Sequence, residues 1–467
     1  MNNKRQFVKG RNCLYAIFFL LFFSLRLLAV EAVDKKISVS FSNLPLKEAI
    51  HEIEVASGYT FFYDGNKIDL TQKVSLNVSN QPIESALNSM LRTTDLSFEI
   101  TSKQMTEVTD IDGHKILMFG SNAYQGLTND QRVIDAAKAA LDKYGSGCAG
   151  SRFLNGTLDL HVQLEKELAE FMHKDESLCF STGFSVNQGV LACVVGRNDY
   201  IICDDRDHAS IVDGRRLSFA TQLHYKHNDM EDLERVLKTL PHEAIKLIVV
   251  DGVFSMEGDL ANLPEIVKLK HKYNCSIMVD EAHGLGVFGK QGRGVCDHFG
   301  LTDEVDLIMG TFSKSLASIG GFIASDKDTI NFLRHSCRTY IFSASNTPAA
   351  TAAALEALHI IQNEPERFEQ LWDVTNYALK RFREEGFEIG ETESPIIPLY
   401  VRDAMKTFEV TKKAYDRGVF INPVIPPACA PQDTLVRFAL MATHTKEQVE
   451  RGVKILKEVF VEEGVIK

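Results

Sequence analysis

The 467-residue chain lacks an excess of positive charge and lacks any clustering of its cysteines. Its 51 Lys and Arg residues are outnumbered by 63 Asp and Glu residues, and the formal net charge is −12. This balance, with no basic stripe to offset it, argues against a nucleic-acid-binding protein. The nine cysteines form no Cys-x-x-Cys pair, and eight of them, from Cys148 to Cys429, are scattered through apolar or strand-like segments. This pattern is typical of reduced thiols in a cytosolic protein of two or three domains.

The first 32 residues indicate a different compartment. Four basic residues between Lys4 and Arg11 precede the apolar run 13–25, and small residues follow up to Ala32. This order is typical of a secretory signal with cleavage after Ala32. Because Arg26 interrupts the apolar run, a full membrane span is less expected, but an uncleaved anchor and membrane association stay open. The two compartment signals therefore conflict.

An internal repeat follows. Residues 41–53 and 78–90 align at an offset of 37, and each copy predicts an alternating strand, an Asn cap, a Pro in the first turn and an amphipathic helix. A second strand is predicted after each helix, at 59–64 and 96–100. The repeat resembles the short N-terminal module of secretins and TonB-dependent receptors, which implies a small α+β binding module over residues 37–101. An unrelated small α/β domain is the alternative.

The chain changes character near Thr106. Helical patterns at 132–144 and 162–172 are followed by apolar strands separated by further helical stretches. Strands that are apolar throughout predict a mainly parallel sheet covered by helices on both faces, with ligands bound at the carboxyl ends of its strands. The predicted strands are "ESLCFS", "DYIICD", "AIKLIVVDGV", "CSIMVDEA" and "VDLIMG".

The last of these strands delivers a lysine into a tight turn. Thr311, Ser313 and Lys314 follow the apolar residues 307–309, and Gly320 and Gly321 close the stretch. A phosphate loop of the Walker type is not favoured, because no glycine directly precedes the lysine. A solvated loop lysine and a lysine that forms a Schiff base beside phosphate-binding hydroxyls both remain open.

Polar residues also end the other predicted strands. A pyridoxal phosphate (PLP) ring needs a lysine for its aldehyde, a carboxylate for its pyridine nitrogen, and a donor near its ring oxygen. It also needs a flat group stacked on the ring and amides at a helix start for the phosphate. These parts would come, in that order, from Lys314, Asp280, His283, His208 and the Gly183–Phe184 turn. A zinc site at the two histidines would need a third ligand that no spacing supplies.

Six motifs carry a family resemblance over residues 115–445. They are "YGSGCAGSRFLNGT", "STGFSVNQG", "DDRDHASIVDG", "DGVFSMEGD", "VDEAHGLGVFG" and "GTFSKSLASIGG". In these motifs the chain is similar to the α-oxoamine synthases, which are PLP enzymes of fold type I. The resemblance implies a large domain with a mainly parallel sheet, here 106–345, and a smaller C-terminal α/β domain, here 346–467.

The resemblance also assigns roles to individual residues. Lys314 would hold PLP and remove the α-proton of the amino acid, Asp280 would pair with the pyridinium, and His208 would stack on the ring. The remaining cofactor residues would be Gly183, Phe184, Ser255, His283, Thr311, Ser313 and, from the second subunit of a homodimer with shared active sites, Ser343. Arg437 would anchor the substrate carboxylate beside Asn122, because a guanidinium binds a carboxylate through two hydrogen bonds.

The implied activity is a PLP-dependent acyl transfer to an amino acid. L-serine would condense with a long-chain acyl-CoA, with loss of CoA and CO₂, to give 3-ketosphinganine when the acyl group is palmitoyl. Three alternatives remain: a related synthase using glycine or alanine, an aminotransferase, and a periplasmic interaction protein with an inactive PLP-type body. We expect the catalytic part to lie in the cytoplasm or on the cytoplasmic face of the inner membrane. The family's N-terminal helical segment, which lies over the substrate entrance, is replaced here by residues 1–105, through a true fusion or two joined reading frames.

Overall fold

The computed structural model describes residues 36–57, 69–92, 94, 106–109 and 114–467. The chain divides into two compact units, Met1–Ser102 and Lys103–Lys467. The predicted signal or anchor segment at 1–32 and the predicted strands at 59–64 and 96–100 lie outside the described residues. In the described part of the chain, no helix has the length and apolar character needed to cross a membrane.

The smaller unit is built on the predicted repeat. Strand β1 (Lys36–Pro45) leads into helix α1 (Leu46–Ser57), and β2 (Lys73–Pro82) leads into α2 (Ile83–Leu91). The two strands pair antiparallel, with Ser40 opposite Asn77. These partners are themselves 37 residues apart, so the pairing relates the two copies by a local two-fold axis. Both helices bury an apolar face against the strands, as the amphipathic pattern predicts.

Side-chain hydrogen bonds follow the same symmetry, and they correct the predicted caps. The backbone N–H of Asn43 donates to Ser75 Oγ at 2.8 Å, and that of Asn80 donates to Ser38 Oγ at 2.9 Å. The two asparagines do not cap the helices. They have φ values of 56° and 53° within the strand segments, a left-handed conformation that asparagine tolerates. Each helix begins directly after its proline, which therefore precedes the first turn instead of lying in it.

The larger unit contains a seven-stranded sheet in the order β5-β11-β10-β9-β8-β6-β7. The five strands from β10 to β7 in this order run parallel, as predicted, while β11 pairs antiparallel with both of its neighbours. The strands are β5 (Glu176–Phe180), β6 (Tyr200–Asp204), β7 (Thr221–Tyr225), β8 (Lys246–Asp251), β9 (Ser276–Asp280), β10 (Leu307–Thr311) and β11 (Gly321–Ser325).

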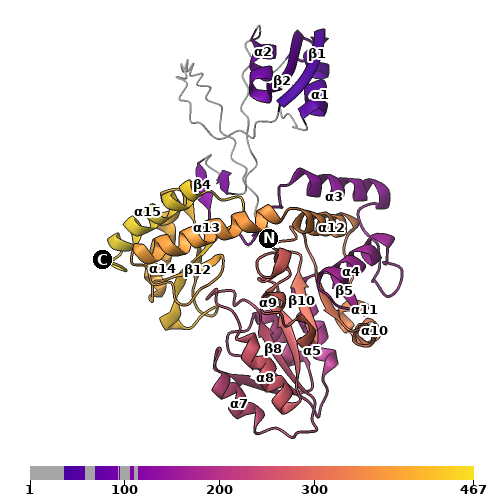
Figure 1. Cartoon of the computed structure of the whole chain (residues 1–467), viewed down its shortest axis with the longest axis vertical. Coiled ribbons are helices and arrows are strands. Elements are labelled where there is room, and N and C mark those ends of the chain that lie inside the picture. Colours follow the sequence, from indigo (N-terminus) through magenta and orange to yellow (C-terminus); the bar gives the residue numbers. More distant parts are fainter. Residues whose placement is uncertain (1–35, 58–68, 93, 95–105, 110–113) are drawn as a thin grey trace, which may run out of the picture. The chain divides into compact units, whose positions relative to one another are not determined.

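Helices cover both faces of this sheet (Figure 1). Successive strand residues alternate between the two cores: Ile201 packs with α5, α6 and α10, whereas Ile202 packs with α4, α7, α8 and α12. The helices are α3 (Gln131–Tyr144), α4 (Asp159–Phe171), α5 (Gly183–Val194), α6 (Ala209–Leu217), α7 (Met230–Leu237), α8 (Leu263–Tyr273), α9 (Val295–His298), α10 (Lys327–Ser336), α11 (Arg338–Ile341) and α12 (Pro348–Asn363).

A third hydrophobic core lies among the C-terminal elements, drawn orange to yellow in Figure 1. Two three-stranded sheets, β12-β15-β14 and β13-β4-β3, contribute to this region. Because β4 pairs with β13, these early residues share a sheet with the C-terminal part, and the predicted boundary at 345/346 stays a prediction. The elements are β3 (Glu107–Thr109), β4 (Lys115–Met118), α13 (Pro365–Glu384), β12 (Ile396–Tyr400), α14 (Ala404–Asp416), β13 (Val419–Phe420), β14 (Asn422–Val424), β15 (Leu435–Ala439) and α15 (Lys446–Glu462).

The predicted lysine turn is the connection of a β-hairpin. Strands β10 and β11 pair antiparallel up to Thr311 opposite Gly321, and the N–H of Phe312 donates to the carbonyl of Gly320 at 2.9 Å. Gly320 has a φ of 140°, and a Cβ there would lie 2.5 Å from Phe312 and Asn346 atoms, so a side chain does not fit. The hairpin therefore holds Lys314 at the carboxyl end of β10, beside the ends of β9 and β8.

Candidate active site

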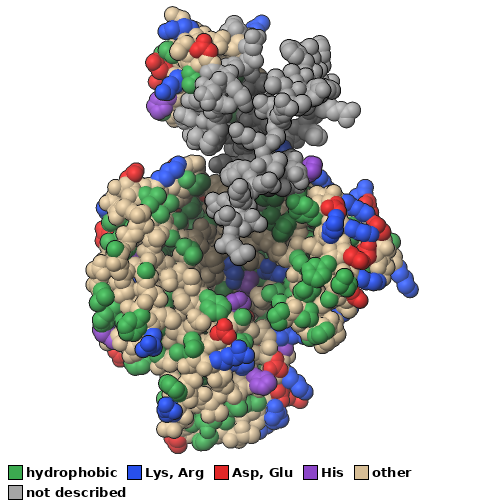
Figure 2. All heavy atoms as spheres, turned by 180° about the vertical axis from the view of Figure 1, so that it is seen from behind, with side chains coloured by type: hydrophobic (Ala, Val, Ile, Leu, Met, Phe, Trp, Pro, Cys, Tyr) green, Lys and Arg blue, Asp and Glu red, His purple; other side chains and the backbone are tan. Residues whose placement is uncertain are grey.

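A cavity of about 330 Å³ lies at the carboxyl ends of the central strands. Figure 2 shows a hollow in the larger unit in which Lys or Arg and His side chains gather. Eight of the predicted site residues line the cavity together: Gly183, Phe184, His208, Asp280, His283, Thr311, Ser313 and Lys314. The prediction that strand ends bring these residues together is therefore confirmed by the structure, while their chemical roles remain proposals.

The amine of Lys314 is the one cationic group among the side chains that line this cavity. Burial lowers the pKa of Lys314 from its ordinary 10.5 to about 8, although the carboxylates of Asp280 and Asp251 oppose the shift. About a tenth of the amine is consequently neutral at pH 7, far more than for an ordinary lysine. A neutral amine is the form that attacks an aldehyde or accepts a proton.

Asp280 ends β9 and is held by donors on both carboxylate oxygens. Oδ2 accepts from Asn187 Nδ2 at 2.7 Å, and Oδ1 accepts from the backbone N–H of Ala282 at 2.9 Å. Asn187 lies in α5 and also donates to Ser210 Oγ at 2.8 Å. Ser210 Oγ in turn lies 2.7 Å from Nδ1 of His208. A continuous set of hydrogen bonds thus joins the carboxylate of Asp280 to the imidazole of His208.

His208 is fixed through its main chain as well as its ring. Its backbone N–H donates to Asp251 Oδ2 at 2.9 Å, and the N–H of Asp251 donates to Asp207 Oδ1 at 3.0 Å. Burial, with the nearby Asp280 charge, raises the pKa of Asp251 well above its ordinary value. Burial lowers the pKa of His208, so its ring is neutral near neutral pH. Two buried carboxyl groups therefore tie the turn that carries His208 to the end of β8.

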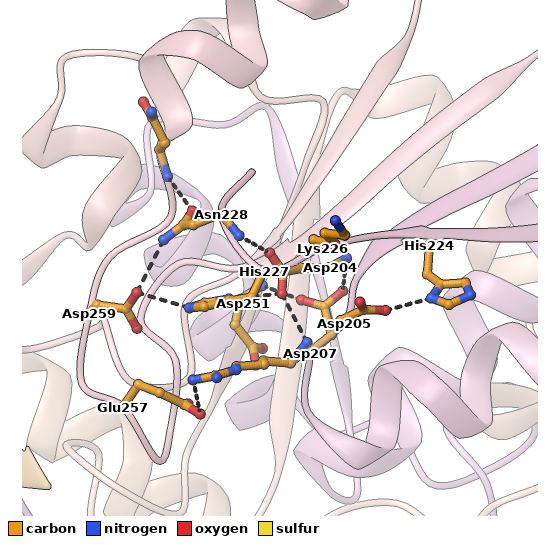
Figure 3. A network of polar contacts seen from close by, with 12 residues as sticks. Asp204, Asp205, Asp207, His224, Lys226, His227, Asn228, Asp251, Glu257 and Asp259 are labelled. Atoms are coloured by element: carbon orange, nitrogen blue, oxygen red, sulfur yellow. Dashed lines mark hydrogen bonds and ion pairs between the residues drawn. The ribbon is translucent and has the colours of Figure 1, made fainter. Parts of the chain in front are cut away.

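A wider acidic network supports this turn (Figure 3). His227 lies between two carboxylates: Nδ1 is 2.9 Å from Asp204 Oδ1, and Nε2 is 3.0 Å from Asp259 Oδ2. Burial alone would lower the pKa of His227, but the hydrogen bonds to Asp204 and Asp259 outweigh it and raise the pKa to about 9. The ring is therefore an imidazolium at neutral pH. It links the end of β6 to the loop that contains Ser255 and Glu257.

A second buried set of hydrogen bonds reaches His283 from the C-terminal elements. The hydroxyl of Tyr124 lies 2.7 Å from Nδ1 of His283, and Arg437 Nη2 donates to the same hydroxyl at 3.3 Å. Arg437 Nη1 donates to Asn122 Oδ1 at 2.7 Å, while its Nε is buried without a hydrogen-bond partner among the described residues. The two residues predicted to bind the substrate, Asn122 and Arg437, are thus hydrogen-bonded to each other. Arg437 keeps one donor, Nε, for a further partner.

The opposite end of the cavity offers donors for an anion. Thr182 caps α5 by accepting from the N–H of Ser185, so the first amides of that helix stay available at its N-terminus. A Cβ on Gly183 would lie 2.7 Å from Thr311 Oγ1, and the Thr311 and Ser313 hydroxyls are 2.9 Å apart. A side chain at position 183 would collide with Thr311, so the glycine allows the first amides of α5 to lie beside the two hydroxyls. Together with the low-pKa amine of Lys314 and the buried carboxylate of Asp280, this arrangement fits PLP.

Some of the predicted site residues do not line the cavity, and some residues that support the site were not predicted. Ser255 and Ser343 are half-buried and do not line the cavity, so their cofactor roles stay predictions. Tyr124, Asn187, Ser210 and Asp251 were not identified from the sequence. Asp251 could have been, because it ends a strand as Asp280 does. Asn187 lies in α5, Ser210 lies in α6 and Tyr124 follows β4, so none of the three ends a strand and strand-end reasoning gives no signal for them. In the described part of the chain, no group of three or more His, Cys, Asp or Glu side chains could hold a metal ion.

Comparisons with known proteins agree on the family. Residues 114–456 match the model of aminotransferase class I and II, and residues 59–106 match that of the secretin and TonB N terminus short domain. Proteins named serine palmitoyltransferase from Bacteroides ovatus and Bacteroides thetaiotaomicron are each 78% identical over 362 residues, which cover 78% of this chain and 92% of each relative. The 8-amino-7-oxononanoate synthase of Bacillus pumilus is 41% identical over 360 residues, or 77% of this chain and 92% of the relative.

Solved structures give the same result. A serine palmitoyltransferase from S. paucimobilis with a bound PLP–myriocin aldimine superposes with a TM-score of 0.76 at 36% identity, covering 78% of this chain and 92% of that one. The serine palmitoyltransferase of Sphingomonas wittichii superposes with a TM-score of 0.75 at 39% identity, covering 78% and 91%. The predicted fold, with a mainly parallel sheet of the PLP fold type I, is thereby confirmed.

The His227 network predicts a pH-dependent stability of the larger unit. Because the pKa of His227 rises from 6.5 to about 9 on folding, its contribution is complete below pH 6.5 and is lost as the pH rises through 9. The contribution is at most about 3 kcal/mol. We expect His227→Gln to lower the free energy of unfolding at pH 7 and to flatten its decline between pH 7 and 10. Urea unfolding monitored by fluorescence of Trp372, the single tryptophan, reports this unit alone. An equally steep pH decline in the variant would contradict the assignment.

Proposed function

Because the chain belongs to the class I and II aminotransferase family, and within it to the α-oxoamine synthases, we propose that it is a serine C-palmitoyltransferase. The reaction condenses L-serine with a long-chain acyl-CoA and yields 3-ketosphinganine, CoA and CO₂. The identity of 78% to relatives of that name, against 41% to the 8-amino-7-oxononanoate synthase, supports serine over other amino acids. The structural observation that carries the proposal is one cavity lined by Lys314, Asp280 and His283, with Arg437 joined to His283 through the hydroxyl of Tyr124.

The residues that would hold PLP lie at both ends of the cavity. Lys314 would bind its aldehyde carbon, the carboxylate of Asp280 would pair with its ring nitrogen, and His283 would donate to its ring oxygen. The N-terminus of α5, with the hydroxyls of Thr311 and Ser313, would bind its phosphate. Bound PLP supplies an electron-withdrawing ring that lets the α-carbon of the amino acid lose a proton.

Proton transfer from the substrate is assigned to Lys314. Its pKa of about 8 lets Nζ accept the α-proton near neutral pH and return it later. The carboxylate of Asp280 stays in place during this transfer because Asn187 and the Ala282 amide both donate to it. His208 lies beside Phe184 with the ring centroids 6.4 Å apart. Its neutral ring, held by Ser210 and Asp251, would cover one face of the bound ring and exclude water from it.

Arg437 is assigned to the substrate carboxylate. Its guanidinium is buried, contacts Asn122 and Tyr124, and keeps Nε unpartnered. A buried donor without a partner costs free energy, and an arriving carboxylate would remove that cost. Lysine would not reproduce this geometry, since its ammonium cannot form two parallel hydrogen bonds.

The requirement for acyl-CoA also leads us to propose that the catalytic unit works in the cytoplasm or at the cytoplasmic face of the inner membrane.

We further propose that two copies of the chain form a homodimer with shared active sites. Phe342 is 73% exposed and Leu154 is 78% exposed, and their segments are joined by a bridge between Ser151 and Ala344. Ile319, which lines the cavity, is also exposed. The predicted phosphate ligand Ser343 does not line this chain's own cavity. The apolar side chains exposed around the cavity favour a second subunit that covers them.

The dimer is tested by charging this exposed surface. We expect Phe342→Glu combined with Leu154→Glu to give a monomer in sedimentation velocity and to weaken PLP binding, because the partner's phosphate ligand is lost. Phe408→Glu changes a half-exposed phenylalanine on α14 and should leave both properties unchanged. A monomeric variant that keeps its PLP affinity would count against shared sites.

Replacement of Lys314 tests the proposed catalytic residue. We expect Lys314→Ala to abolish product formation and the borohydride-reducible visible absorbance of bound PLP, because no other lysine lines the cavity. Lys327→Ala removes an exposed lysine at the start of α10 and should behave like the parent protein. Retention of both the reducible absorbance and activity in Lys314→Ala would disprove the assignment.

The amino acid and acyl preferences test the proposed reaction itself. With the full chain loaded with PLP, we expect 3-ketosphinganine from L-serine and palmitoyl-CoA, detected by mass spectrometry. Turnover with glycine, with L-alanine or with acetyl-CoA should be at least tenfold slower. Faster turnover with glycine or alanine would identify a sister synthase. Exchange of amino groups with a keto acid but no CoA release would identify an aminotransferase, and no turnover with any pair would favour an inactive body.

A further inference from the structure

Tyr124 connects two groups that have different tasks in the proposed reaction. It follows β4 and is fully buried in the core of the C-terminal elements. Its hydroxyl lies 2.7 Å from Nδ1 of His283, which faces the cavity, and 3.3 Å from Nη2 of Arg437 on β15. Residues of three separate segments therefore meet at one oxygen atom.

The donors and acceptors around this oxygen can be assigned from elementary chemistry. A guanidinium group only donates hydrogen bonds, so the Tyr124 oxygen accepts from Arg437. Burial raises the pKa of Tyr124, and its hydroxyl keeps its proton. That proton is directed to the remaining neighbour, Nδ1 of His283, which must accept it. The donor of each hydrogen bond is thus fixed: Arg437 donates to Tyr124, and Tyr124 donates to His283.

The proton count on His283 follows. Burial, with the nearby charges of Lys314 and Arg437, holds the pKa of His283 well below its ordinary value, so the ring carries one proton. Because Nδ1 accepts from Tyr124, the proton resides on Nε2. His283 lines the cavity, so its remaining N–H is the donor available to a bound ring.

We propose that Tyr124 is a positioning residue that fixes His283 as the Nε2–H tautomer and links this donor to the carboxylate anchor at Arg437. This inference rests on the proposed function, because it names how the same site orients cofactor and substrate together. A phenylalanine at position 124 would keep the ring volume but would leave Nδ1 of His283 and Nη2 of Arg437 without this partner. Either His283 tautomer could then form, and the guanidinium would lose one of its two fixed contacts.

The first test reads the tautomer directly by ¹⁵N NMR of histidine-labelled, PLP-loaded full chain, with His283→Gln identifying the resonances of His283. We expect a protonated Nε2 and an unprotonated Nδ1 in the parent protein. In Tyr124→Phe, we expect a mixture of tautomers or a shift of the proton to Nδ1. Tyr377 lies on α13 and donates to Glu450 on α15, so Tyr377→Phe loses a hydroxyl contact away from the cavity and should leave the resonances of His283 unchanged. A protonated Nδ1 in the parent, or an unchanged tautomer in Tyr124→Phe, would overturn the proposal.

The second test measures the link to the anchor. Loss of one hydrogen bond is worth about 0.5–1.5 kcal/mol, so we expect the dissociation constant of serine to rise roughly two- to twelvefold in Tyr124→Phe. The serine-induced change in PLP absorbance supplies this constant without turnover, and Tyr377→Phe again serves as the control. An unchanged constant would overturn the link to Arg437. The NMR result is independent of the reaction, so a chain that holds PLP without condensing serine would fail as the proposed enzyme and still report the tautomer of His283.

Discussion

The burial of one lysine amine at the end of β10 is the constraint on which the rest of the site depends. A charged amine removed from water is costly, and its pKa falls until part of the population is neutral. Further cations nearby would raise that cost. Burial accordingly lowers the pKa of both histidines of the cavity, which stay neutral, and each has a hydrogen bond at Nδ1, with Ser210 for His208 and with Tyr124 for His283. The carboxylates of Asp280 and Asp251 compensate the remaining positive charge from the two neighbouring strands.

The sheet determines where these groups meet. Asp251 and Asp280 are direct partners in the register of β8 and β9, and Met309 of β10 is the partner of Asp280. Strand β10 therefore continues two residues beyond the level of both carboxylates, to Thr311, before the lysine turn begins. Helix α5 starts from the same edge of the sheet, so one element supplies both the anion-binding amides and Asn187, which holds Asp280. Parallel strands place their carboxyl ends at one edge of the sheet. Apart from the β10–β11 hairpin, this site therefore needs no unusual backbone conformation to bring its residues together.

Much of this arrangement was predictable from the sequence for a physical reason. Strands that are apolar on both faces end abruptly at polar residues, and these residues share one edge of a parallel sheet, so Lys314, Asp280 and His208 could be grouped before the structure was known. Strands β7 and β11 were missed, because one is polar and the other is a glycine-led antiparallel strand. Tyr124 and Asn187 do not line the cavity but hold residues that do, His283 and Asp280. No sequence pattern distinguishes such a core tyrosine or helix asparagine from any other. In the smaller unit the repeat predicted strand and helix correctly, but the asparagines pair with serines of the other copy, a contact across 37 residues that local capping rules do not contain.

The β10–β11 hairpin also limits how the chain can vary in length. Strand β11 is bonded on both edges, and its adjacent residues Phe322 and Ile323 enter cores on opposite faces of the sheet. One residue added to or removed from the turn would either exchange these two side chains between the cores or distort the turn that aims Lys314. The connection thus acts as a spacer of fixed length. Insertions in related chains should accumulate in outer loops between helices and strands, while the distance in sequence from Thr311 to Gly321 stays constant.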